Sequence, residues 1–310
     1  MLGSAIGALS DRLDSKFLTA FWLPAFVAVL GGFGILAGLV GADQLVAWID
    51  ELDSVQETIA VILIMLAITM VASVLRALSR PIISLFAGEA MPRVVAEWSI
   101  RNQRKARQIL SRSLLPGKGQ HEVSGSSRPY PAVLRQRFPQ DESLVQPTAF
   151  GNVLETAREH AWIAYAMDGN LWWPRLTPLL PQEFRAMLGG AQAPLMALLN
   201  LSVVFCVLAV VAVAAFGFRG GEWVTALIAA LAMLVLARFC YHAAVGLATE
   251  VASILRVAFD LYRHEILSQL GLETPGDLAA ERTLWQELDD RLLDLPSRPT
   301  GGLDPTAGAA

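Results

Sequence analysis

The sequence predicts an all-α membrane protein with four transmembrane helices in two hairpins and a helical cytoplasmic juxtamembrane domain. Hydrophobic residues make up 54% of the 310 positions and charged residues only 17%, whereas charged residues are about a quarter of an ordinary soluble chain. Four apolar stretches approach or exceed the roughly 20 residues that a helix needs to cross a bilayer. Because only a helix satisfies all of its own backbone hydrogen-bonding groups in lipid, each stretch is predicted to be helical.

The first predicted hairpin occupies residues 17–80. Its first span, 17–40, contains no charged residue. Its second span, 58–78, is uncharged up to Arg76. The residues between the spans, 41–56, include four acidic side chains and no basic one, and they are predicted to form a short acidic loop.

Small residues form a ridge on the first span. Gly34 and Gly38 are four positions apart, so they share one helix face and are predicted to be helix-packing residues. In the preceding segment, 1–16, leucine and isoleucine recur at helical spacing. This pattern favours a helix lying at the membrane surface, with a frayed tail as the alternative.

The second predicted hairpin occupies residues 191–247. Its spans, 195–218 and 223–245, are joined by a short polar break. Charged side chains are costly at membrane depth and are therefore candidates for function. Arg238 and His242, however, lie near the end of the fourth span, where they can reach the lipid head groups. Contact with the head groups is the interpretation adopted for both residues.

The distribution of basic residues predicts the orientation. Fifteen Lys or Arg residues lie between Arg76 and Ala193, none lies in the acidic loop, and only Arg219 lies between the third and fourth spans. Cytoplasmic loops carry an excess of Lys and Arg. The sequence therefore predicts that both termini and the central region lie in the cytoplasm.

The predicted cytoplasmic insert covers residues 81–190. Helical periodicity predicts a helix over 92–114 with a basic middle. Attraction of this helix to anionic lipid and an ordinary solvated helix face are both compatible with the pattern. Residues 116–147 are rich in Pro, Gly and Ser and are predicted to form a mobile loop.

The block 147–181 is the most distinctive part of the chain. Asn152 is followed three residues later by Glu155, which predicts a capping box at the start of a helix over 153–167. Gly169 is expected to end this helix in the left-handed conformation.

Two tryptophans and an arginine follow this helix and precede the third span. Trp172, Trp173 and Arg175 are accompanied by three prolines, a composition that predicts an extended segment. Tryptophan rings and guanidinium groups are favoured at the boundary between lipid and water. These three residues are therefore predicted to contact lipid head groups.

The same block carries a resemblance. It reads PT-x-x-GN-x-L from Pro147 and WPRL-x-PLLP from Trp173 to Pro181, with Tyr165 and Asp168 between the two motifs. This pattern resembles one in a family of uncharacterised bacterial multi-pass membrane proteins with two helical pairs around a cytoplasmic insert. The resemblance implies this architecture and a bacterial origin, and therefore a place in the bacterial inner membrane, but it implies no activity.

The C-terminal region continues the fourth helix. An apolar stripe at helical spacing runs on to about Leu270, and a further helix is predicted from Leu278, so residues 248–295 are expected to be cytoplasmic helices. The tail, 296–310, is predicted to be disordered.

Few residues are candidates for catalysis. Glu155, His160 and Asp168 are acid and base types close together in sequence, and such groups near the head groups can perform acid–base chemistry on a lipid. The alternative is that these residues cap helices or anchor the chain at the membrane surface, roles that need no catalysis. The chain lacks HExxH, GxSxG and zinc-ligand spacing, so no metal, no cofactor and no assigned catalytic residue are predicted.

The preferred functional interpretation is a non-enzymatic, membrane-anchored interaction or sensing component. Its expected partners are the lipid bilayer, a cytoplasmic protein and further copies of the chain. The alternatives are a homo-oligomeric channel or membrane-permeabilising effector, and a lipid-modifying membrane enzyme. Nucleic acid is not expected as a partner, because the net charge is −4 and no basic run is interleaved with aromatic residues.

Overall fold

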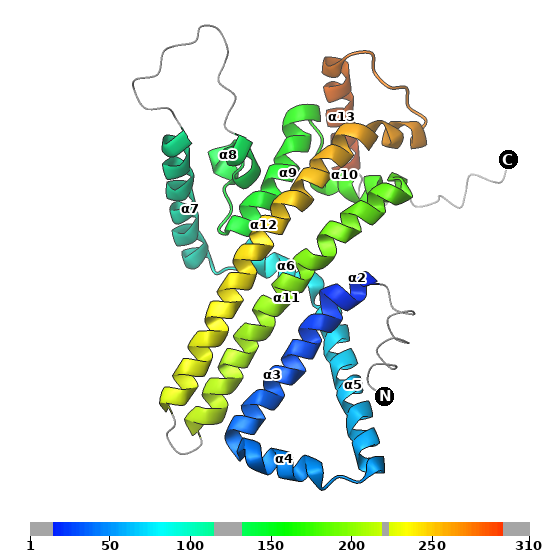
Figure 1. The fold of residues 1–310 in the computed structure, drawn as a ribbon. Coiled ribbons are helices and arrows are strands. Elements are labelled where there is room, and N and C mark those ends of the chain that lie inside the picture. The colour runs from blue at the N-terminus through cyan, green and yellow to red at the C-terminus, as the bar shows by residue number, and fades with distance from the viewer. Residues whose placement is uncertain (1–14, 115–131, 219–222, 294–310) are drawn as a thin grey trace, which may run out of the picture. The chain divides into compact units, whose positions relative to one another are not determined.

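The computed structural model describes residues 15–114, 132–218 and 223–293, and the regular elements in these ranges are helices (Figure 1). The predictions for the surface helix up to residue 14, for 116–131 of the mobile loop and for the tail lie outside the described residues. The chain forms two compact units: unit 1 is Met1–Thr156 with Pro181–Leu255, and unit 2 is Ala157–Leu180 with Arg256–Ala310.

Four helical stretches are long and apolar enough to cross a membrane. They are Ser15–Val40, Ser54–Ala77, Gln182–Gly217 and Trp223–Gln269. The predicted fold class, all-α with four membrane-length apolar helices, is therefore confirmed. In unit 1 the outward face of the fourth stretch exposes large apolar side chains, as expected where lipid replaces water; they include Leu227, Ile228, Leu231, Val235 and Phe239.

The first stretch is built from three consecutive elements. α2 (Ser15–Phe17) leads into a π-helical turn, η1 (Leu18–Trp22), and then into α3 (Leu23–Val40). The amide side chain of Asn200 donates a 2.7 Å hydrogen bond to the carbonyl of Ala20 within this turn. A side chain from the third stretch thus satisfies a backbone group of the π-helical turn inside the apolar bundle.

The predicted acidic loop contains a helix, and that prediction is corrected here. α4 (Ala42–Asp50) begins directly after Gly41, whose φ of 101° requires the conformational freedom of glycine. α5 (Ser54–Ala77) then begins with a capping box in which the Asp53 carboxylate accepts from the Val55 N–H, and the Gln56 side chain accepts from the Asp53 N–H.

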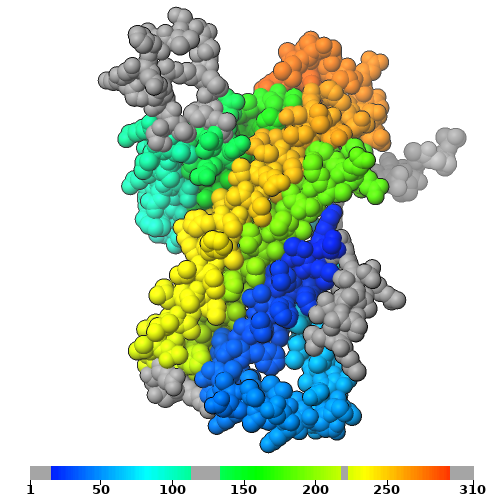
Figure 2. Space-filling view, in the orientation of Figure 1, coloured from blue at the N-terminus to red at the C-terminus, as the bar shows by residue number. Residues whose placement is uncertain are grey.

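The third and first spans pack closely. α11 (Gln182–Phe218) lies along α3, and the two run side by side in Figure 1 and Figure 2. A Cβ added at Gly31 would lie 2.5 Å from Leu208, and one added at Gly38 would lie 2.8 Å from Phe216. Gly38 thus lies close to α11, whereas a Cβ at Gly34 would meet nothing within 4 Å.

The insert of unit 1 is more helical than the sequence predicted. α6 (Ser79–Ala87) follows α5, and α7 (Arg93–Leu114) matches the predicted helix. α8 (Ala132–Arg137) and the 3₁₀ turn η2 (Glu142–Leu144) lie within the predicted mobile loop, so that prediction is wrong for these residues. α9 (Ala149–Tyr165) comes next, and its last turns belong to unit 2.

Unit 2 joins segments that are far apart in the sequence. It contains the end of α9, α10 (Gly169–Leu176), the 3₁₀ turn η3 (Thr177–Leu179), the end of α12 (Trp223–Gln269) and α13 (Leu278–Leu293). The predicted left-handed cap at Gly169 is wrong. Ala166 has the positive φ of 58°, and Gly169 is the first residue of α10. The predicted extended segment is also wrong, because α10 is helical with Pro174 inside it.

Candidate functional site

The start of α9 is fixed to α6 and α7 by the residues of the PT-x-x-GN motif. The hydroxyl of Thr148 accepts a 2.8 Å hydrogen bond from the Gly151 N–H and donates one of 2.6 Å to the Phe86 carbonyl. A Cβ at Gly151 would overlap the carbonyl oxygen of Ala87, so only glycine allows this approach. The motif therefore has a structural explanation in the docking of α9.

Asn152 completes this junction, and its predicted capping role is wrong. The helix begins at Ala149, so Asn152 lies within it and is fully buried. Its carbonyl oxygen accepts from the Gln146 N–H at 2.8 Å, and its amide donates to Gln103 on α7 at 3.3 Å. Glu155, the other predicted cap residue, accepts from the Gln146 side chain at 3.5 Å.

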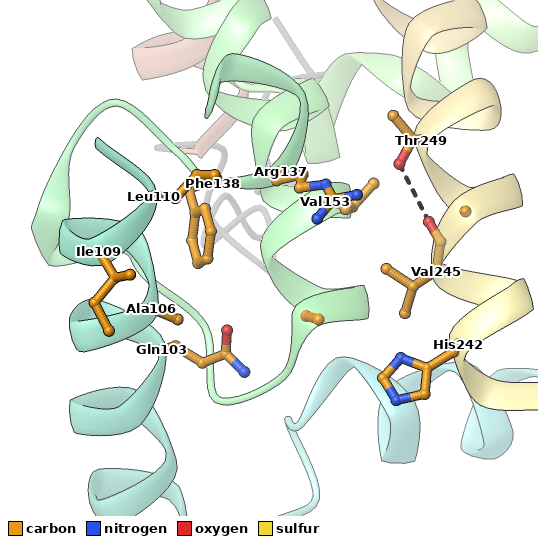
Figure 3. Close-up of a pocket in the computed structure, with 12 residues that line it drawn as sticks. Gln103, Ala106, Ile109, Leu110, Arg137, Phe138, Val153, His242, Val245 and Thr249 are labelled. Carbon is orange, nitrogen blue, oxygen red and sulfur yellow. Dashed lines mark hydrogen bonds between the residues drawn. The ribbon is translucent and has the colours of Figure 1, made fainter. Parts of the chain in front are cut away.

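A pocket of about 600 Å³ lies beside this junction, between α7, the end of α8, α9 and α12. We call it the α7–α12 pocket. Figure 3 shows Phe138 pointing into the space, with Leu110 on α7 and Val245 on α12 on opposite sides of it. Val153 lines the pocket from α9. Its walls are mainly apolar, and its size is within the range of small-molecule sites.

Four polar residues line the pocket. Gln103 and His242 point into it from α7 and α12, and Arg137 lines it from the end of α8 (Figure 3). The hydroxyl of Thr249 donates to the carbonyl of Val245 at 3.2 Å, which satisfies its donor within α12. Gln103, Arg137 and His242 can therefore donate hydrogen bonds to a ligand whose body is apolar. The structure brings His242 to this pocket, which the sequence did not predict.

The predicted catalytic residues are divided between the two units. Glu155 belongs to unit 1, whereas His160 and Asp168 belong to unit 2. The imidazole of His160 lies 2.7 Å from the carboxylate of Asp260, and the Asp168 carboxylate caps α10 by accepting from the Asn170 N–H at 2.8 Å. Both groups are used in contacts that stabilise unit 2.

Trp172 is a core residue of unit 2, and its predicted contact with head groups is wrong because its side chain is 0% exposed. Its indole N–H donates to the carboxylate of Asp289, and its ring meets that of Trp285 edge to face with centroids 5.0 Å apart. Trp173 lies 6.0 Å from the Phe259 ring, and the guanidinium of Arg175 lies 5.6 Å from the Trp172 ring. For Trp173 and Arg175 the contact with head groups stays a prediction.

Two buried carboxylates on α13, Glu281 and Asp289, accept hydrogen bonds in the core of unit 2. Asp289 also accepts from the Asp168 N–H at 3.0 Å. Glu281 accepts from Arg263 at 2.6 Å and from the indole of Trp285 at 3.2 Å. Burial raises the pKa of Asp289 above its ordinary value, although both of its hydrogen bonds oppose this.

Sequence periodicity did not identify Glu281 and Asp289. They are spaced four residues on either side of Trp285, so all three lie on one face of the helix. The predicted helix starts at Leu278, yet that leucine is more than half exposed. The spacing of the carboxylates around a tryptophan was the available signal.

The remaining predicted site residue is Arg238. Its side chain is exposed in unit 1, and its guanidinium lies 5.8 Å from the Tyr241 ring. Among the described residues, no group of three or more His, Cys, Asp or Glu side chains is placed to hold a metal ion.

Among the described residues, the chain thus has four helices that are long and apolar enough to cross a membrane, as in a multi-pass membrane protein, and further helices outside the apolar stretches. A scan against models of known protein families, a search of curated proteins and a search of solved structures found no match. The function is therefore inferred from the pocket and its surroundings.

Proposed function

We propose that this protein is a non-enzymatic, membrane-anchored sensing component of the bacterial inner membrane, and that the α7–α12 pocket binds an apolar or amphipathic molecule on the cytoplasmic side. The observation that carries the proposal is the position of this mainly apolar pocket of about 600 Å³. A helix that begins at Trp223 crosses the hydrocarbon core within about 20 residues. The pocket residues on α12, from His242 to Thr249, come directly after that length.

The pocket has walls from two different parts of the chain. α7 belongs to the insert, whereas α12 is the continuation of the fourth candidate span. A ligand that contacts both walls stabilises the arrangement in which they are the right distance apart, and it thereby shifts the population towards that arrangement. Occupancy of the pocket would in this way be transmitted to the insert.

The helices around the pocket are joined to one another by contacts of residues next to its lining. Next to His242, the Tyr241 hydroxyl accepts from the Phe150 N–H at 3.4 Å, and its ring stacks on that of Phe86 with centroids 5.7 Å apart. The Ser99 hydroxyl donates to the Pro147 carbonyl at 2.5 Å. These contacts favour the arrangement that forms the pocket, and a ligand that touches both walls would stabilise it further.

The cytoplasmic location is supported by the arrangement of helix ends. Lys16, Arg76 and Gly189 line one small pocket of unit 1, so the start of the first span, the end of the second and the approach to the third lie together. This is the arrangement that two hairpins require. Combined with the excess of basic residues in the insert, it favours the cytoplasm for this end of the bundle.

The test is photo-crosslinking of a diazirine-bearing fatty acid to the full chain in vesicles, followed by mass spectrometric mapping. Gly246 lines the pocket, and a Cβ added there would meet nothing within 4 Å, so the Gly246→Leu side chain is expected to occupy pocket space. If it excludes two to three methylene groups of the ligand, affinity falls by about 2 kcal/mol, or roughly thirtyfold. Label on α7 and α12 beside the pocket should fall accordingly.

Gly190→Leu is the matched control, because Gly190 is also helical and free of neighbours but does not line the pocket. It should leave the label at the pocket unchanged. Label confined to the candidate spans, or an equal loss in both variants, would contradict the proposal.

A further inference from the structure

A second pocket of unit 1, of about 400 Å³, lies where three candidate spans begin or end. It is lined by two basic residues, Lys16 on α2 and Arg76 at the end of α5, and by the polar side chain of Gln192 on α11. Aromatic and aliphatic side chains cover the rest, among them Phe17 and Met196. The pocket thus combines positive charge with an apolar surface at the end of the membrane-length helices.

The two basic groups are held at the pocket by close contacts. The guanidinium of Arg76 lies 5.7 Å from the centroid of the Phe17 ring, a cation–π distance. The ammonium of Lys16 lies against the backbone of α11, since a Cβ added at Gly189 would come 2.5 Å from its Nζ. Glycine at this position therefore leaves space for the lysine.

An anion bound in this pocket is attracted by both basic groups. Guanidinium groups bind phosphate with two parallel hydrogen bonds, and lysine adds a point charge. Basic pockets between transmembrane helices on the cytoplasmic side are suited to phospholipid head groups. The apolar residues Phe17, Phe21 and Met196 offer a surface for the adjoining acyl chains.

We propose that this pocket binds the head group of an anionic phospholipid from the adjacent leaflet, with Lys16 and Arg76 contacting the phosphate. This proposal is independent of the α7–α12 pocket, because the two pockets share no lining residue. It distinguishes Arg76 from the other basic residues near the membrane, which are expected to interact with anionic lipid only through general surface attraction.

The test compares Arg76→Gln with Arg80→Gln by native mass spectrometry of the full chain, using phosphatidylglycerol and phosphatidylcholine as probes. Both arginines are exposed near the end of α5, but only Arg76 lines the pocket. The wild-type chain should retain phosphatidylglycerol in preference to phosphatidylcholine. Arg76→Gln should lose roughly fivefold in phosphatidylglycerol affinity, Lys16→Gln with Arg76→Gln roughly thirtyfold, and Arg80→Gln much less than Arg76→Gln. Equal losses for the two single variants would overturn the proposal.

A second pair of variants keeps the charge. Gly189→Ala forces the Lys16 ammonium out of its position, whereas Gly190→Ala, one residue further on, meets no neighbour within 4 Å. Gly189→Ala should weaken binding of phosphatidylglycerol, and Gly190→Ala should not. If both alanine variants bind as the wild type does, the assigned role of Lys16 is wrong.

Added inorganic phosphate distinguishes a lipid site from a site for free anions. A lipid held by both its head group and its acyl chains should stay bound when phosphate is added in excess. Displacement of phosphatidylglycerol by inorganic phosphate would show that the pocket binds free anions, and it would overturn the proposal.

Discussion

The carboxylate of Asp260 contacts two side chains near the end of α9, those of His160 and Tyr165. The Tyr165 hydroxyl donates to its carboxylate at 2.8 Å, and the His160 imidazole lies 2.7 Å from the same oxygen. The guanidinium of Arg263 lies 3.9 Å from the centroid of the Tyr165 ring. Burial and then the hydrogen bond to Asp260 raise the pKa of Tyr165 to about 12, although the charge of Arg263 opposes this.

Tyr165 should therefore titrate later than an ordinary tyrosine. Because its folded pKa lies above the ordinary value of 10, its contribution to stability is fully present below pH 10 and is lost as the pH rises through about 12. The measurement is the alkaline absorbance titration of tyrosinate, taken as wild type minus Tyr165→Phe. A difference curve with its midpoint near 12 is expected, and a midpoint near 10 would contradict the buried hydrogen bond.

Glu281 shows the opposite shift. Burial alone would raise its pKa, but the hydrogen bonds from Arg263 and Trp285, with the charges of Arg263 and His264, outweigh burial and hold the pKa below the ordinary value of 4.5. A carboxylate with a lowered folded pKa adds stability above its unfolded pKa, and this stability is lost as the pH falls through the folded value.

Glu281→Gln should accordingly destabilise unit 2 in a pH-dependent way. At neutral pH the loss of charge-assisted hydrogen bonds should cost about 1.5–3 kcal/mol. The measurement is hydrogen exchange of the peptide that covers α13, with variant and wild type compared at each pH. The difference between them should be largest at neutral pH and shrink below pH 4.5. A difference that stays constant down to the acid limit would assign the stabilisation to packing alone.

At the scale of elements, the first span distinguishes two glycines that the sequence treated alike. A side chain at Gly38 would press on Phe216 of α11, whereas one at Gly34 would meet no neighbour within 4 Å. Gly38→Leu should therefore lower the melting temperature in detergent, because overpacking costs about 1–3 kcal/mol. Gly34→Leu should leave the melting temperature of the monomer unchanged.

The variants Gly34→Leu and Gly38→Leu also test whether the chain forms the predicted homo-oligomer. If a second copy packs on the ridge at Gly34, Gly34→Leu should abolish dimers that chemical crosslinking detects in the wild-type chain. Crosslinked dimers that survive Gly34→Leu would remove this face as an interface. An equal loss of thermal stability in both variants would show that the face at Gly34 is already packed within the chain.

Periodicity predicted the long helices and failed for the short ones. The extension of α12 follows an apolar stripe, and α7 follows a helical periodicity that is interrupted only by its basic middle. Both helices were predicted nearly to their ends. α10 was not predicted, because Trp172, Trp173 and three prolines within ten residues indicated an extended chain. Burial of Trp172 against α13 overrides that local preference. α4 was not predicted, because the acidic residues of 41–56 were interpreted as a sign of a loop between two spans.

At the scale of the molecule, composition predicted the four membrane-length helices, but it could not predict the core of unit 2. The hydrogen bond from Trp172 to Asp289 joins residues 117 positions apart, and those from Arg282 to the end of α9 join residues 118 and 119 positions apart. Such pairs leave no periodic signal. The α7–α12 pocket was unpredictable for the same reason, since its walls come from α7, α9 and α12.

The orientation of the chain is the prediction that links the pockets to one side of the membrane. Cys206 and Cys240 are the only cysteines, and both lie in candidate spans, so replacing them with alanine gives a background without thiols. Asp50→Cys on α4 and Lys105→Cys on α7 then place single thiols at exposed positions. The excess of basic residues in the insert predicts that α7 lies inside. A membrane-impermeant maleimide should label Asp50→Cys in intact spheroplasts, and it should label Lys105→Cys only after permeabilisation.

Gln286→Cys on α13 extends this test to the C-terminal helices, because Gln286 is exposed in unit 2. It should behave as Lys105→Cys does, because two crossings, by the third and fourth candidate spans, would return the chain to the side on which the insert lies. Labelling of Lys105→Cys in intact spheroplasts would invert the orientation and place the α7–α12 pocket outside the cytoplasm. Opposite labelling of Lys105→Cys and Gln286→Cys would show that one of the four apolar helices does not cross the membrane.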